Sequence, residues 1–303
     1  MKKLVLIFLL LGSASLKTLS QPPASPRALL NLAYVANGHE RQKLDLYLPA
    51  TANAKLPLIV WIHGGGWLNG NKDRPPALRF LEQGYAVAGI NYRLSHHAKF
   101  PAQIEDCKAA IRWLRAHADA YGLDAQRIGV WGSSAGGHLV ALLGTTGDVK
   151  EFEVGEHLNQ SSRVQAVVDY FGPTDFLQMD AHRLPDGLVH DLSTSPESKL
   201  IGAPIQEAKA QVARANPITY VSRDDPPFLL VHGDQDKLVP HHQSVLLHEA
   251  LKKAGVTASL YTVSGGGHGG FKDPNLDPMV EAFFARHLRH AVHRMSYCGE
   301  PYS

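Results

Sequence analysis

Ser134 lies in the pentapeptide Gly132-Ser133-Ser134-Ala135-Gly136, which has the Gly-x-Ser-x-Gly spacing of a nucleophile elbow. The apolar run before it, residues 127–131, predicts a strand, and residues 137–143 after it predict a helix. Between a strand and a helix, glycines permit a sharp turn that holds the serine hydroxyl clear of the sheet, at the positive end of the helix. The pattern therefore predicts that Ser134 is a nucleophile.

A serine hydroxyl is a weak nucleophile near neutral pH, so it requires a base, and the base requires an acid that orients it. His268 is the predicted base, because it follows the predicted strand 258–263 in a loop of five glycines. Asp236 is the predicted acid, because it follows the predicted strand 228–231. Asp234, two positions earlier, remains the alternative acid, with a turn-forming role as its other interpretation.

The segment His63-Gly64-Gly65-Gly66-Trp67 directly follows an apolar strand predicted at residues 58–62. Glycines at such a place expose backbone N–H groups to a substrate oxygen. We predict an oxyanion hole formed by the amides of Gly65, Gly66 and Ala135. Trp67 is predicted to line the substrate pocket, with packing in the core as the open alternative.

Strands alternate with helices along the chain, which favours a mainly parallel sheet covered by helices on both faces. With 303 residues the chain is long enough for one such domain, predicted over residues 21–303. Residues 172–227 predict a lid-like insertion or a pocket wall, or alternatively helices packed on the outside of the sheet. A net charge of +2 with scattered basic residues argues against a nucleic-acid partner.

The first residues, Met1-Lys2-Lys3, precede a short apolar run at 4–11, followed by small residues. This pattern predicts a signal peptide over residues 1–20 and a secreted or periplasmic protein, with no membrane span. The chain contains two cysteines, Cys107 and Cys298. An exported protein can join two such residues in a disulfide, and the sequence leaves that question open.

Five segments together resemble the α/β-hydrolase superfamily, and more narrowly the exported bacterial carboxylesterases similar to feruloyl and acetyl-xylan esterases. They are HGGGW at 63–67, GSSAGGH at 132–138, GPTDF at 172–176, HGDQD at 232–236 and GHG at 267–269. The resemblance implies the α/β-hydrolase fold, with Ser134 as nucleophile, Asp236 as acid, His268 as base, and neither cofactor nor metal.

The implied substrates are esters with small or aromatic acyl groups, including those attached to plant polysaccharides. Two other functions remain open from the sequence. One is an amide or formamide hydrolase with the same three residues, and the other is a catalytically silent binding module. The sequence does not predict the oligomeric state.

Overall fold

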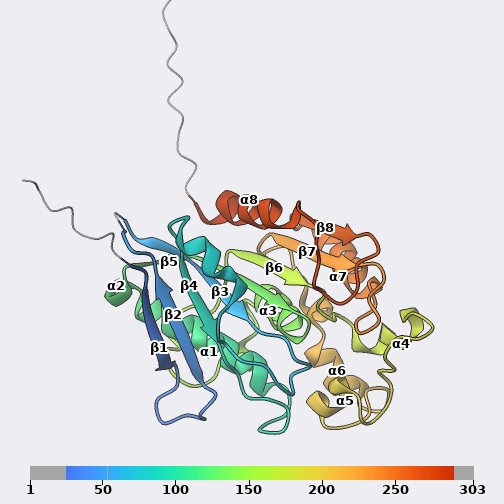
Figure 1. Ribbon diagram of the computed structural model, residues 1–303. Helices are drawn as coiled ribbons and strands as arrows, with labels where there is room; N and C mark the ends of the chain where they lie inside the picture. The colour runs from blue at the N-terminus through green and yellow to red at the C-terminus, as the bar shows by residue number, and fades with distance from the viewer. Residues whose placement is uncertain (1–24, 53, 290–303) are drawn as a thin grey trace, which may run out of the picture.

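The computed structural model describes residues 25–52 and 54–289, and their centre is one eight-stranded sheet (Figure 1). The strand order is β1-β2-β4-β3-β5-β6-β7-β8. The strands are β1 (Arg27–Ala33), β2 (Lys43–Leu48), β3 (Leu56–Ile62), β4 (Ala86–Ile90), β5 (Leu123–Ser133), β6 (Ala166–Tyr170), β7 (Phe228–Gly233) and β8 (Ala258–Val263). The pairs β1–β2 and β2–β4 are antiparallel and the other pairs are parallel. The prediction of a mainly parallel α/β sheet is confirmed.

Helices cover both faces of the sheet (Figure 1). The 3-10 helix η1 (Pro76–Leu81) and α8 (Leu276–Leu288) pack on one face. The opposite face carries α1 (Ala102–Ala116), α3 (Ala135–Thr145) and α7 (His242–Lys253), with the short helices α2 (Ala118–Tyr121) and η2 (Lys150–Phe152) near its edge. Because successive side chains of a strand point to opposite faces, β3 sends Val60 into one core and Ile59 into the other.

Two local features differ from what the sequence favours. Residues 77–82, which lie between two apolar segments, fit a crossover helix by sequence, but the structure forms the 3-10 helix η1 there, starting at Pro76. Strand β1 was not predicted, because residues 21–35 contain three prolines and the strand itself alternates only between exposed and half-buried positions. It lies at the edge of the sheet and pairs with β2 alone.

The segment between β6 and β7 holds only short helices: η3 (Phe176–Gln178), α4 (Met179–His182), α5 (Pro196–Ile201), α6 (Lys209–Ala215) and η4 (Pro217–Tyr220). In Figure 1 it occupies the right-hand end of the molecule. Buried His138 of α3 donates its Nε2–H to the carbonyl of Ala215 at 2.7 Å, which fixes α6 against α3. Burial lowers the pKa of His138 to about 4, so its ring is neutral.

The predicted signal peptide, residues 1–20, lies outside the described residues, and so does Cys298. Cys107 is buried on α1. The signal peptide, the export and the disulfide therefore stay predictions. Across residues 25–52 and 54–289, the helices are too short or too polar to cross a membrane.

Candidate active site

Ser134 occupies a strained turn between the end of β5 and the start of α3. Its backbone angles are φ 56° and ψ −121°, a region that non-glycine residues rarely adopt and that costs about 1–3 kcal/mol. The turn is held by the Ser134 N–H, which donates to the carbonyl of Tyr170 at 2.8 Å. It also requires glycine at position 136, because a Cβ there would lie 2.1 Å from the carbonyl oxygen of Ile62. The structure thus has the elbow that the pentapeptide predicts.

His268 and Asp236 meet through a short hydrogen bond, although 32 residues separate them. His268 Nδ1 donates to Asp236 Oδ2 at 2.7 Å, so in the neutral imidazole Nε2 is the nitrogen that can accept a proton. Phe171 packs against the imidazole with ring centroids 4.6 Å apart. His268 and Ser134 line the same cavity, so the three predicted residues come together at one edge of the sheet.

Asp236 is held rigidly in its loop. Its Oδ1 accepts the N–H groups of Leu238 at 2.8 Å and Val239 at 3.0 Å. Burial alone would raise its pKa, but hydrogen bonds from His232 and His268 outweigh burial and hold the pKa well below its ordinary range. The alternative acid, Asp234, instead accepts the N–H of Gly265 at 2.8 Å, which ties the acid loop to the histidine loop.

His232 is a site residue that the sequence did not assign. Fully buried at the end of β7, it places Nε2 3.2 Å from Asp236 Oδ2 and 2.9 Å from the carbonyl of Val239. Its Nδ1 accepts from the hydroxyl of Ser244 at 2.8 Å. His232 therefore contacts the same carboxylate oxygen of Asp236 as His268 does. The four-residue spacing to Asp236 is the only sequence signal for this contact.

The predicted oxyanion loop reaches the same cavity, which Gly65, Gly66 and Ala135 all line. Gly65 and Gly66 have positive φ values of 103° and 60°, which glycine adopts readily. Ala135 is the first residue of α3, so its N–H has no partner within the helix. The three residues therefore lie at the cavity that contains Ser134, and the oxyanion role of their amides stays a prediction.

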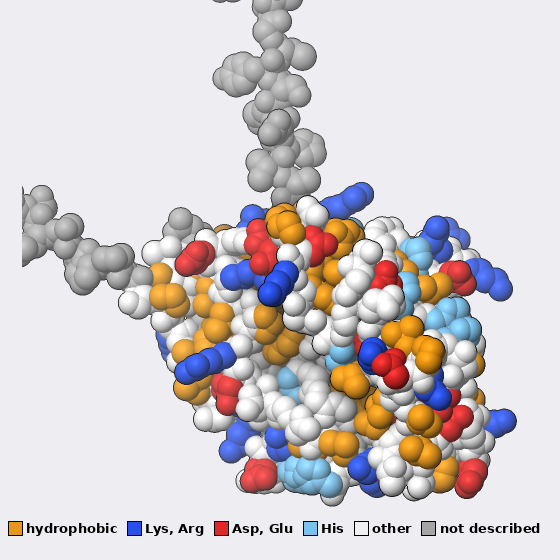
Figure 2. Space-filling model, turned by 45° about the vertical axis from the view of Figure 1, so that its right-hand side comes forward, with side chains coloured by type: hydrophobic (Ala, Val, Ile, Leu, Met, Phe, Trp, Pro, Cys, Tyr) orange, Lys and Arg blue, Asp and Glu red, His pale blue; other side chains and the backbone are white. Residues whose placement is uncertain are grey.

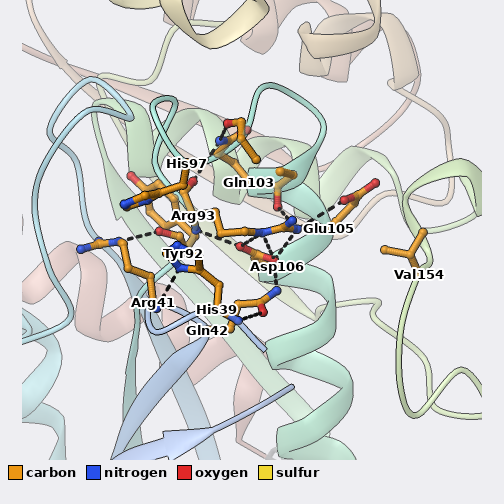
Figure 3. Close-up of polar contacts among 12 residues, drawn as sticks. His39, Arg41, Gln42, Tyr92, Arg93, His97, Gln103, Glu105, Asp106 and Val154 are labelled. Carbon is orange, nitrogen blue, oxygen red and sulfur yellow. Dashed lines mark hydrogen bonds and ion pairs between the residues drawn. The ribbon is translucent and has the colours of Figure 1, made fainter. Parts of the chain in front are cut away.

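Arg41, a residue without a predicted role, holds both ends of this loop. Its Nη2 donates to His63 Nε2 at 3.1 Å and to the carbonyl of Gly70 at 2.9 Å. Its Nε donates to the carbonyl of Tyr92 at 2.8 Å, a contact drawn in Figure 3. His63 stacks on Tyr92 and donates from Nδ1 to the carbonyl of Gly64 at 2.7 Å. Burial, aided by the charge of Arg41, lowers the pKa of His63 to about 4 and keeps it neutral.

We expect Arg41→Met to lower kcat for ester hydrolysis about 10–100-fold, with a smaller change in KM, because misplaced oxyanion donors weaken transition-state binding. Steady-state kinetics on p-nitrophenyl acetate measure both constants. Arg214→Met is the matched control, since Arg214 pairs with Glu151 at the surface and does not line the cavity. An unchanged kcat in Arg41→Met would contradict this role.

The cavity has a volume of about 610 Å³ and mainly apolar walls. Part of the segment between β6 and β7 lines it, through Pro173, Leu188, Pro196 and Glu197. Leu188 and Leu238, which both line the cavity, are 38% and 49% exposed. Figure 2 shows hydrophobic side chains at several places on one face of the molecule, including its right-hand half. Trp67 also lines the cavity but is only 1% exposed and packs on Phe176, so its contact with substrate stays a prediction.

Asp169 is a buried carboxyl group directly behind the elbow, in register with Gly132 of β5. Its Oδ1 accepts the N–H of Gly172 at 2.9 Å, while its enclosed Oδ2 has no hydrogen-bond partner among the described residues. Burial, only partly opposed by that hydrogen bond, raises the pKa of Asp169 to about 7. The side chain is therefore protonated in weakly acidic solution.

This raised pKa predicts a pH-dependent stability. Folded Asp169 keeps a proton that the unfolded chain releases near pH 4, so the contribution of Asp169 to stability falls from about pH 4 to about pH 7. His63 and His138, whose pKa values are lowered by burial, contribute in the opposite direction in both proteins. Asp169→Asn cannot ionise, so we expect the stability of the wild type relative to this variant to fall by roughly 2–4 kcal/mol across this window. Urea unfolding at pH 4.5 and pH 8 measures the difference, with the exposed Asp224→Asn as control. Parallel pH profiles for wild type and Asp169→Asn would contradict the prediction.

The mainly parallel sheet, with a serine elbow after β5, an acid after β7 and a histidine after β8, defines the α/β-hydrolase fold. A model of the BD-FAE family matches residues 44–251. The chain belongs to this family of α/β-hydrolases.

Among curated relatives, the probable carboxylic ester hydrolase LipM of Mycobacterium tuberculosis (strain ATCC 25618 / H37Rv) is 36% identical over 203 residues. The match covers 66% of this chain and 45% of that protein. The chain spans about half the length of the curated relatives it matches.

Two solved structures are similar over most of the chain. A truncated form of a carbohydrate esterase from gut microbiota is 37% identical with a TM-score of 0.79, covering 88% of this chain and 98% of that one. A bifunctional GH43-CE protein of Bacteroides eggerthii is 39% identical with a TM-score of 0.78. The match covers 86% of this chain and 38% of that one. The expected resemblance to carbohydrate-directed esterases is confirmed.

Proposed function

We propose that this protein is a serine carboxylesterase in which Ser134, His268 and Asp236 act together. The observation that carries the proposal is one cavity lined by both Ser134 and His268, with the histidine bonded at 2.7 Å to Asp236. The names of the similar proteins, esterases and carbohydrate esterases, support the same reaction.

In this mechanism His268 Nε2 removes the hydroxyl proton of Ser134 as the serine oxygen attacks the ester carbonyl. The carbonyl oxygen becomes an oxyanion, which the amides of Gly65, Gly66 and Ala135 stabilise. His268 then protonates the leaving alcohol. Water, activated by the same imidazole, hydrolyses the acyl-enzyme, and Asp236 keeps the imidazole in the required tautomer throughout.

We propose esters of small or aromatic acids as substrates, including acetyl and feruloyl groups on plant polysaccharides. A cavity of about 610 Å³ exceeds what an acetyl group needs and accepts an aromatic ring between apolar walls. Similarity to a carbohydrate esterase and to a bifunctional GH43-CE protein supports a carbohydrate-linked ester. The predicted export is consistent with polymeric substrates outside the cell.

Two measurements test the reaction. A fluorophosphonate probe should label Ser134, and the modified peptide is identified by mass spectrometry. p-Nitrophenyl acetate should be hydrolysed far faster than p-nitroacetanilide. Faster cleavage of the anilide would favour the amide hydrolase, and failure both to label and to hydrolyse any ester would favour a silent binding module.

A panel of acetyl, butyryl, feruloyl and long-chain esters of one common alcohol tests the substrate class. We expect the acetyl or feruloyl member to give the highest kcat/KM. A preference for the long-chain ester would contradict the proposed substrates, while leaving the esterase mechanism intact.

A further inference from the structure

The segment between β6 and β7 carries a buried pair of ionisable side chains that the mechanism above does not use. His190 Nδ1 lies 3.0 Å from Glu197 Oε2, and the two side chains are 1% and 4% exposed. Both backbones are fixed, since the His190 N–H donates to Asp180 and Glu197 lies in the first turn of α5, capped by Ser195. The surrounding backbone therefore holds His190 and Glu197 next to each other.

The pair leaves its hydrogen-bonding capacity unused among the described residues. Both ring nitrogens of His190 and Glu197 Oε2 are enclosed without an aligned hydrogen bond. Glu197 Oε1 also accepts no hydrogen bond from the described residues. Unlike Oε2, it is not among the fully buried side-chain atoms. His190 contacts only one of the two carboxylate oxygens, and a buried carboxylate with an unsatisfied oxygen is costly. The free oxygen therefore points to a polar partner supplied by a bound molecule.

Glu197 lines the cavity that contains Ser134 and His268, and it is the one carboxylate among the described lining residues. Its neighbour Pro196 lies against the predicted oxyanion loop, where a Cβ on Gly66 would be 3.4 Å from the Pro196 Cβ. Oε2 is enclosed beside His190, so Oε1 is the oxygen left to accept a hydrogen bond from a molecule in the cavity.

We propose that Glu197, oriented by His190, is a substrate-binding residue that accepts a hydrogen bond from a hydroxyl group of the ester substrate. This inference rests on the proposed esterase function. A hydroxyl group suits the site because His190 already lies 3.0 Å from one carboxylate oxygen, so the other oxygen needs only a single neutral donor rather than a full cation. The hydroxyl belongs either to a phenolic acyl group or to a sugar alcohol.

The test compares pairs of substrates that differ mainly in hydroxyl groups. Methyl 4-hydroxycinnamate against methyl cinnamate tests the acyl side, and a monoacetylated methyl xyloside against cyclohexyl acetate tests the alcohol side. We expect the wild type to prefer the hydroxylated member of one pair about tenfold or more in kcat/KM, the range of a charged hydrogen bond. A preference within the cinnamate pair would place the recognised hydroxyl on the acyl group, and a preference within the acetate pair would place it on the alcohol.

Variants connect that preference to the carboxylate. Glu197→Met removes both acceptor oxygens and should abolish the preference, while Glu197→Gln keeps one oxygen and should retain part of it. His190→Leu should weaken the preference by releasing the carboxylate. Glu207→Met is the matched control, because Glu207 is exposed in the same segment and does not line the cavity.

The outcomes separate this inference from the proposed function. If p-nitrophenyl acetate is hydrolysed but the wild type shows no hydroxyl preference in either arm, the hydroxyl site is wrong and the esterase stands. A preference that survives in Glu197→Met, or a higher kcat/KM for 2-aminoethyl than for 2-hydroxyethyl acetate, also overturns it. Without any ester hydrolysis both proposals fail. The comparison of substrate pairs uses the wild-type protein. It therefore still tests the hydroxyl site if Glu197→Met proves unstable.

Discussion

Ser134→Ala is expected to lower kcat for p-nitrophenyl acetate by about 10⁶-fold, the loss typical when a serine hydrolase loses its nucleophile. Without the hydroxyl no acyl-enzyme forms, and only the oxyanion donors and binding remain to assist water. Replacement by alanine also keeps a Cβ at the strained φ of 56°, so the unfolding transition should change little.

Ser133→Ala is the matched control, because Ser133 is the preceding residue and lines the same cavity. It should retain most of the activity and should still react with the fluorophosphonate probe. If Ser134→Ala kept substantial turnover while Ser133→Ala lost it, the two serines would exchange roles and the elbow assignment would be wrong.

Asp236→Asn is expected to lower kcat by about 10⁴-fold, the loss seen when the acid of a Ser-His-Asp triad becomes an amide. Asparagine can still accept the N–H groups of Leu238 and Val239 through its oxygen, so the loop should persist. Its NH₂ group would then face His268 Nδ1 and force the proton onto Nε2. In that tautomer the imidazole cannot take the proton of Ser134.

Asp234→Asn is the control for this experiment, since Asp234 is the alternative acid from the sequence and accepts only the N–H of Gly265. Asparagine retains that acceptor, so kcat should change little. A large loss in Asp234→Asn together with a small loss in Asp236→Asn would reverse the assignment of the acid.

The sequence predicted well where the candidate site residues lie, because the glycines and the strand ends carry local signals. The elbow at Ser134 follows from five consecutive residues, and position after a strand selected His268 from 17 histidines. Asp236 needed the family pattern, because Asp234 fits the loop equally well by sequence alone. The structure adds a physical reason, the 2.7 Å hydrogen bond between Asp236 and His268.

The remaining features depend on contacts that no local pattern encodes. Arg41 reaches His63 across 22 residues and Glu197 meets His190 inside a segment without regular periodicity. Both involve buried polar groups whose partners are distant or irregularly spaced. Strand β1 was missed for a related reason, since an exposed edge strand lacks the apolar run that reveals central strands such as β3.

In the proposed mechanism, reaction and substrate recognition fall to two different parts of the fold. The proposed reacting groups follow β5, β7 and β8, and backbone ladders fix those strands in register. Much of one cavity wall instead comes from the short helices between β6 and β7, which the ladder does not include. Directed evolution confined to that segment should therefore change which esters are accepted without dismantling the hydrolytic apparatus, and related enzymes should diverge there first.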